Sequence, residues 1–172
     1  SFLTFILLLC SLPYQVVLAD EIELPAQSAI AVEADTGKIL YEKDSEKKRD
    51  VGGLSTLLTT YLIFEAIHEK KLSLKDPIKL SEKALALNYI EGAGTLPMEA
   101  NQYTVEQLLT ALLVGNSSTA ALALAEKVGG SEKSFVEKMK QKLTEWGIQS
   151  PHLINATGLN TQTISGDPDG KE

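Results

Sequence analysis

The run of residues 118–128 constrains the fold more than any other segment, because residues 120–125 are all alanine or leucine. Its charged residues, one glutamate and one lysine, lie near its end. A helix that is apolar on every side has no face to present to water, so other elements must surround it. Two glycines at 129–130 end the run, as is common at helix C-termini. The sequence therefore predicts a central helix that is packed on all sides.

Two further helices are predicted around the central one. Thr104 and Gln107 form a capping box ahead of a stripe of leucines, so a helix begins after Thr104. Residues 132–146 predict another helix, which Ser131 opens and Gly147 ends, with lysines along a solvated face.

An earlier helix is predicted over residues 53–70. Its apolar residues form a face broad enough for a buried helix, and they stand at positions 54, 57, 58, 61, 62, 64, 66 and 67. Asp76 and Pro77 break this pattern, and residues 78–80 read as a short extended piece.

Strand patterns flank this helical stretch. Residues 28–34 and 38–42 predict two strands, and the turn sequence at 35–37 joins them into a hairpin. Residues 148–159 predict a return strand that ends in a turn at 155–158. Strands, then helices, then a strand predict an α+β fold.

Charge and residue usage exclude several classes of function. Sixteen Lys and Arg against 23 Asp and Glu give a net charge of −7, which excludes a strongly basic face for duplex nucleic acid. The single cysteine, Cys10, excludes an internal disulfide and a cysteine-based zinc site. The two histidines, His68 and His152, lack the spacing of a metal motif, and we expect both at the surface.

The start of the chain has the pattern of a secretory signal peptide. Residues 1–19 carry no charge, and a small residue, Ala19, precedes the acidic Asp20. The basic n-region is missing, and the apolar run is too short to span a bilayer. Two alternatives are weaker: a lipoprotein site at Cys10, which Leu9 disfavours because it is not small, and a buried N-terminal helix.

We therefore expect an exported mature domain over residues 20–172. Residues 165–172 are polar and rich in Gly and Asp, which is typical of a loop leading to a further element. The expectation is a chain truncated at both ends.

Several segments, in order along the chain, resemble one family. They are residues 30–41 (IAVEADTGKILY), 48–50 (KRD), 57–61 (LLTTY), 104–109 (TVEQLL), 120–126 (AALALAE) and 155–159 (NATGL). The set is similar to low-molecular-weight penicillin-binding proteins, the serine D-alanyl-D-alanine carboxypeptidases of bacterial cell-wall metabolism. The resemblance implies an α+β fold, the N-terminal part of a penicillin-binding-protein and β-lactamase-like transpeptidase fold. In that fold helices flank an antiparallel sheet, and a truncated version leaves a sheet edge and a core face uncovered.

The family's first motif is Ser-x-x-Lys at the start of the helix after the hairpin loop. The serine attacks the peptide carbonyl to form an acyl-enzyme, and the unprotonated lysine takes its proton. In the register set by the flanking residues, Gly53 stands at the serine position and Thr56 at the lysine position. Glycine has no side chain, and a threonine hydroxyl is no base near neutral pH. We therefore predict an inactive chain.

The second motif, Ser-x-Asn, falls on Asn116, Ser117 and Ser118, with hydroxyl and amide apparently exchanged. A register slipped by two residues would use residues 114–116, but it rotates the helix by about 200° and places Val114 at the serine position. The third motif, Lys-Thr-Gly, is expected beyond residue 172.

No other serine replaces the missing nucleophile. Ser55 lies two helical positions from Gly53 and points elsewhere, and Ser117 and Ser118 have no evident base beside them. Ser45 and Lys48 have the literal Ser-x-x-Lys spacing, but they stand in a charged loop where a lysine, with a pKa of about 10.4, is a poor base.

The resemblance thus implies a D-alanyl-D-alanine carboxypeptidase homologue of the cell envelope that is catalytically impaired. The implied partner is a peptidoglycan stem peptide or a β-lactam. No nucleic acid, metal or organic cofactor is implied. A missing C-terminal region could carry a membrane anchor. Two alternatives remain: a non-catalytic module that binds peptidoglycan peptide or penicillin, and a non-functional fragment.

Overall fold

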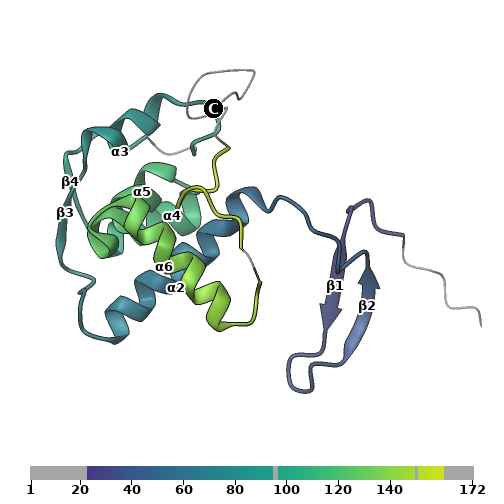
Figure 1. The fold of residues 1–172 in the computed structure, drawn as a ribbon. Coiled ribbons are helices and arrows are strands. Elements are labelled where there is room, and N and C mark those ends of the chain that lie inside the picture. Colours follow the sequence, from purple (N-terminus) through teal and green to yellow (C-terminus); the bar gives the residue numbers. More distant parts are fainter. Residues whose placement is uncertain (1–22, 95–96, 150, 161–172) are drawn as a thin grey trace, which may run out of the picture. The chain divides into compact units, whose positions relative to one another are not determined.

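The computed structural model describes residues 23–94, 97–149 and 151–160, and it divides the chain into two compact units at residues 49 and 50 (Figure 1). Each unit is described by itself. The predicted signal peptide at 1–19 and the polar stretch at 165–172 lie outside the described residues.

The first unit is a β-hairpin. Strand β1 (Ala29–Val32) pairs antiparallel with β2 (Ile39–Lys43), with Ala29 opposite Lys43. The Gly37 amide donates to the Glu33 carbonyl at 2.9 Å, and Gly37 takes a φ of 70°, which glycine adopts without strain. The predicted hairpin is confirmed.

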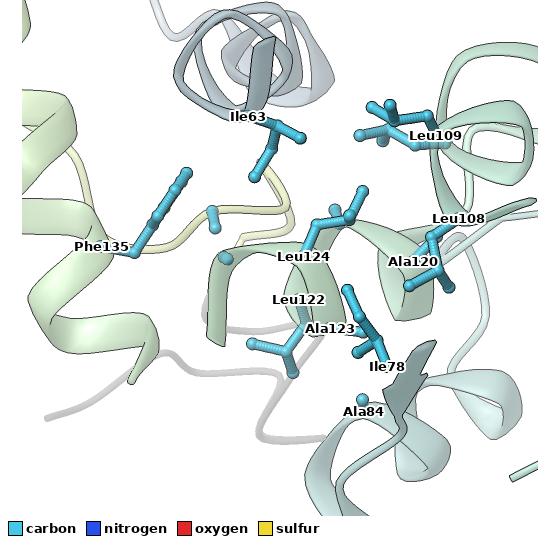
Figure 2. Close-up of a cluster of buried hydrophobic side chains, with 14 of the residues drawn as sticks. Ile63, Ile78, Ala84, Leu108, Leu109, Ala120, Leu122, Ala123, Leu124 and Phe135 are labelled. Carbon is cyan, nitrogen blue, oxygen red and sulfur yellow. The ribbon is translucent and has the colours of Figure 1, made fainter. Parts of the chain in front are cut away.

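Helix α5 (Ser118–Gly129) is the centre of the second unit. Every residue from 118 to 125 is buried, and the helix contacts α2, α3, α4 and α6. Figure 2 shows side chains of α5 surrounded by those of the neighbouring elements, among them Ile63, Ile78, Leu108, Leu109 and Phe135. The prediction of a central helix packed on all sides is confirmed.

Helices α4 and α6, which pack around α5, begin at the capping residues predicted from the sequence. The capping box of Thr104 and Gln107 is present at the start of α4, and the Ser131 side chain accepts from the Ser134 amide at the start of α6. The bounds are η1 (Gly52–Leu54), α2 (Ser55–His68), β3 (Pro77–Lys79), α3 (Glu82–Ala86), η2 (Leu87–Tyr89), β4 (Gln102–Thr104), α4 (Val105–Gly115) and α6 (Glu132–Glu145).

The strands of the second unit form a small sheet of their own. β3 pairs antiparallel with β4, so the described residues hold two separate two-stranded antiparallel sheets. Among the described residues, no helix is both long enough and apolar enough to cross a membrane.

Helix α2 is only partly buried, so the prediction of a buried helix is wrong for one of its faces. Leu62, Ile63 and Ala66 pack in the core, but another face is exposed, with Leu54 and Leu57 more than 60% exposed and Tyr61 and Phe64 more than 40%. Hydrophobic periodicity identifies apolar faces without identifying what covers them.

The predicted return strand at 148–159 is wrong, whereas the turn at its end is confirmed. The Asn155 Oδ1 atom accepts from the Gly158 amide at 2.7 Å and from the Thr157 hydroxyl at 3.1 Å. The backbone of Ala156 bonds to side chains of other elements: its carbonyl accepts from Thr59 Oγ1 at 2.8 Å, and its amide donates to Glu132 Oε1 at 3.2 Å. These groups are therefore satisfied without a strand partner.

Truncating a central leucine tests the role of α5. Leu124→Ala removes a fully buried side chain, and we expect it to lower the free energy of unfolding by about 2–5 kcal/mol. Leu113→Ala on α4 is the control, because Leu113 is 53% exposed and its change should stay within about 0.5 kcal/mol. Urea titration followed by circular dichroism measures both, and equal losses would contradict the central position of α5.

Removing one hydroxyl tests how the turn is held. Thr59→Val keeps the side-chain shape but leaves the buried Ala156 carbonyl without its donor, so we expect a loss of about 1–3 kcal/mol. Thr110→Val is the matched control, since the exposed Thr110 hydroxyl bonds only within its own helix, to the Glu106 carbonyl. The same urea titration compares the two variants, and a Thr59→Val chain as stable as the control would show that this hydrogen bond contributes little.

Candidate active site

The first motif lies where a helix begins. Gly53 belongs to the 3₁₀ turn η1, which runs directly into α2, and it is exposed. Thr56 stands in the first turn of α2, half-buried, and its hydroxyl donates to the Gly53 carbonyl at 2.6 Å. A Cβ atom at position 53 would meet no heavy atom of the described residues within 4 Å. The backbone thus has room for a side chain at position 53.

Ser55 points away from this exposed position. It is 9% exposed, and its hydroxyl is a buried polar atom with no hydrogen-bond partner among the described residues. It faces the 155–158 turn, because a Cβ atom on Gly158 would lie 2.7 Å from Ser55 Oγ. A buried hydroxyl without a base beside it is a poor nucleophile.

The second motif lies at the junction of α4 and α5. Asn116 is the exposed C-cap of α4, in the left-handed conformation with a φ of 49°. Ser117 is the buried N-cap of α5: its hydroxyl accepts from the Ala120 amide at 3.2 Å and lies 3.5 Å from the Met98 sulfur. Ser118 is buried, and its amide donates to the Ala93 carbonyl at 2.8 Å. The Ser117 hydroxyl therefore serves to cap a helix.

The two motifs stand on helices that contact each other, at the starts of α2 and α5. Within the part of the chain that the structure describes, no hydrogen bond links Gly53 or Thr56 to Asn116, Ser117 or Ser118. In the slipped register, Val114 would stand at the serine position, and it is 84% exposed at the end of α4.

The remaining candidates stand in other segments of the chain. The Ser45 hydroxyl donates to the Glu42 carboxylate in the hairpin unit, and Lys48 is exposed. His68 ends α2 and His152 lies in the segment after α6, both exposed as predicted. Within residues 23–94, 97–149 and 151–160, no three His, Cys, Asp or Glu residues gather in a way that could hold a metal ion.

Sequence reasoning missed the role of Glu132. Its carboxylate, 15% exposed, bonds Lys83 Nζ at 2.5 Å and the Ala156 amide at 3.2 Å. Glu132, which belongs to α6, thereby links α3 to the 155–158 turn, which packs against the start of α2. The sequence places Glu132 in the first turn of a helix, a position that favours acidic residues, but its partners lie 49 and 24 residues away.

Comparison with known proteins agrees with this geometry. A sequence model of the peptidase S11 family, D-alanyl-D-alanine carboxypeptidase, matches residues 15–166. The D-alanyl-D-alanine carboxypeptidase DacF of Bacillus subtilis is 32% identical over 142 residues, which cover 83% of this chain and 36% of DacF. DacA of Escherichia coli is 25% identical over 141 residues, covering 80% of this chain and 35% of DacA. The chain thus spans about a third of the length of these relatives.

Solved structures show the same fold. A peptidoglycan synthesis regulatory factor (PBP3) from Streptococcus pneumoniae superposes with a TM-score of 0.77 at 46% identity, covering 85% of this chain and 44% of that one. The D-alanyl-D-alanine carboxypeptidase DacD from Francisella tularensis superposes with a TM-score of 0.73 at 29% identity, covering 81% of this chain and 33% of that one. The fold is therefore of the penicillin-binding-protein type, and the chain belongs to the D-alanyl-D-alanine carboxypeptidase family.

Proposed function

We propose that this chain is a cell-envelope homologue of D-alanyl-D-alanine carboxypeptidases that does not carry out the acyl-enzyme reaction. The observation that supports this most directly is at the start of α2, where Gly53 and Thr56 occupy the positions of the family's serine and lysine. The Thr56 hydroxyl bonds back to the Gly53 carbonyl. Acyl transfer needs a hydroxyl nucleophile and a base within hydrogen-bond reach of it, and Gly53 and Thr56 supply neither the family's serine nor its lysine.

The size of the expected defect follows from the chemistry. Removing a serine nucleophile or its base in a serine hydrolase lowers kcat by about 10⁶-fold. What remains in such variants comes from substrate binding and from polar groups that stabilise the transition state. We therefore expect binding without turnover.

A non-catalytic binding module is the second candidate, and the intact packing around the motif helices favours it over a non-functional fragment. Helix α5 is buried along residues 118–125, and α2, α4, α5 and α6 contact one another through a continuous apolar core. The partner in this proposal is a peptidoglycan stem peptide or a β-lactam. Nucleic acid is disfavoured by the net charge of −7.

The location proposed is outside the cytoplasm. The uncharged residues 1–19 support a secretory signal peptide, followed by the carboxypeptidase-like domain over 20–172.

Labelling with a fluorescent penicillin tests the loss of chemistry. We expect no covalent labelling of the chain as it stands, because Gly53 occupies the family's serine position and the nearby serines, Ser55, Ser117 and Ser118, are buried. The double variant Gly53→Ser/Thr56→Lys introduces both the serine and the lysine of the family motif. Position 53 has space for the serine side chain. Gel fluorescence after denaturation measures the covalent adduct.

The control is Gly53→Ala/Thr56→Lys, which adds the same lysine without a nucleophile. Labelling of the unchanged chain would contradict the proposal and show that another serine reacts. Labelling of the serine variant and not of the alanine variant would show that only the two side chains were missing. If neither variant is labelled, restoring these two groups is insufficient for acylation.

Peptide titration separates a binding module from a non-functional fragment. We expect the purified chain to unfold in one cooperative thermal transition and to bind an acylated peptide that ends in D-Ala-D-Ala, with chemical-shift changes at the starts of α2 and α5. The same peptide ending in L-Ala-L-Ala is the control. A cooperative transition without any preference for the D-Ala-D-Ala peptide would contradict the binding module, and no cooperative transition would favour the fragment.

A further inference from the structure

A cavity in the second unit lies far from the residues at the motif positions. A cavity of about 290 Å³ is lined by the C-terminal part of α2, the end of α5 and the second half of α6. Its first lining residue on α2 is Leu62, nine residues after Gly53, which is roughly 13 Å along the helix axis. The volume is near the lower end of the range for small-molecule sites, about 300–1,000 Å³.

The inner wall of this cavity is apolar. Leu62, Ala66 and Leu72 line it and are each 6% exposed, and Val128 at the end of α5 adds a partly buried side chain. These residues belong to the core or pack against it, so the wall is held in place by the core. Such a wall accepts the hydrocarbon part of a ligand.

The carboxylates around the cavity are all occupied by ion pairs. Lys142 Nζ lies 2.9 Å from Glu65 and 2.9 Å from Glu145, and Lys71 Nζ lies 2.6 Å from Glu69. Hydrogen bonds to Glu145 and Glu65 raise the pKa of Lys142, and the hydrogen bond from Lys71 lowers the pKa of Glu69. Lys142 and Lys71, whose pKa values are raised, and Glu69, whose pKa is lowered, therefore stay charged over the physiological pH range.

Two lysines of the cavity remain unpaired. Lys127 from α5 and Lys138 from α6 both line it and are exposed, and neither has a carboxylate partner within 4 Å among the described residues. With four lysines and three glutamates, the lining has a positive excess in a chain whose net charge is −7. Two unpaired ammonium groups beside one cavity favour an anion between them.

We propose that this cavity binds a small organic anion, whose apolar body lies on Leu62, Ala66 and Val128 and whose phosphate or carboxylate group lies between Lys127 and Lys138. The arrangement is independent of the proposed loss of catalysis, since no motif residue lines the cavity. Phosphate and carboxylate share the recognition chemistry, because a lysine contacts either as a point charge.

Titration of the ¹⁵N-labelled full chain with phenyl phosphate, benzoate and phenol tests the proposal. We expect phenyl phosphate to shift the amides of Leu72, Val128 and Lys138 with a dissociation constant of about 1 mM. Benzoate should shift the same amides, and comparison of the two constants distinguishes a phosphate site from a carboxylate site. Phenol should bind at least tenfold more weakly. Equal binding of phenol, or no shifts at these amides with either anion, would overturn the proposal.

Two charge-matched double variants assign the anion site. Lys127→Gln/Lys138→Gln should weaken binding of phenyl phosphate by about tenfold or more. The control is Lys133→Gln/Lys140→Gln, which removes the same charge from α6 at residues outside the cavity, and it should stay within about twofold of the parent. Thermal unfolding verifies that both variants fold like the parent. Equal weakening in both would indicate attraction to overall charge and would overturn the site.

Discussion

The burial of helix α5 is the constraint on which the second unit depends. Residues 120–125 are all alanine or leucine, so the helix is stable only when other elements cover it. Helices α2, α4 and α6 supply that cover, and α3 contributes from another side. Helices α3, α4 and α6 begin at side-chain caps, whereas α2 begins without one. Both motif positions, at the starts of α2 and α5, are therefore set by this packing.

A second constraint holds the start of α2. The 155–158 turn is held together by the hydrogen bond from the Gly158 amide to the Asn155 side chain. Hydrogen bonds between the Ala156 backbone and the side chains of Thr59 and Glu132 attach the turn to the rest of the unit. Gly158 has no space for a side chain, because a Cβ atom there would lie 2.3 Å from the Gly52 carbonyl oxygen. The backbone that presents Gly53 to solvent is thus supported from behind by a turn about a hundred residues away.

Scaffold and chemistry are separable in this protein. The family's fold depends on apolar packing and helix caps, whereas its reaction depends on a few side chains that face solvent. Gly53 and Thr56 do not belong to the core, so the core does not depend on the side chains at these two positions. The cavity between α2, α5 and α6 is built in a similar way. Core residues form its wall, and the lysines at its rim are not part of the core.

Local sequence determined the hairpin, the helix boundaries and the identity of the residues at the motif positions, because turns, caps and hydrophobic periodicity act over a few residues. Tertiary structure alone decided which apolar faces are covered: Leu57 and Phe64 have the same periodicity as Leu62 and Ile63, yet they stay exposed. It also replaced the expected strand before Asn155 with a segment held by side chains, and it brought Thr59 to Ala156 across 97 residues. Lys127 and Lys138 read as ordinary surface lysines in the sequence, and only the packing of α5 against α6 places them beside one cavity. Contacts between residues distant in sequence depend on how the whole unit packs, which no local pattern specifies.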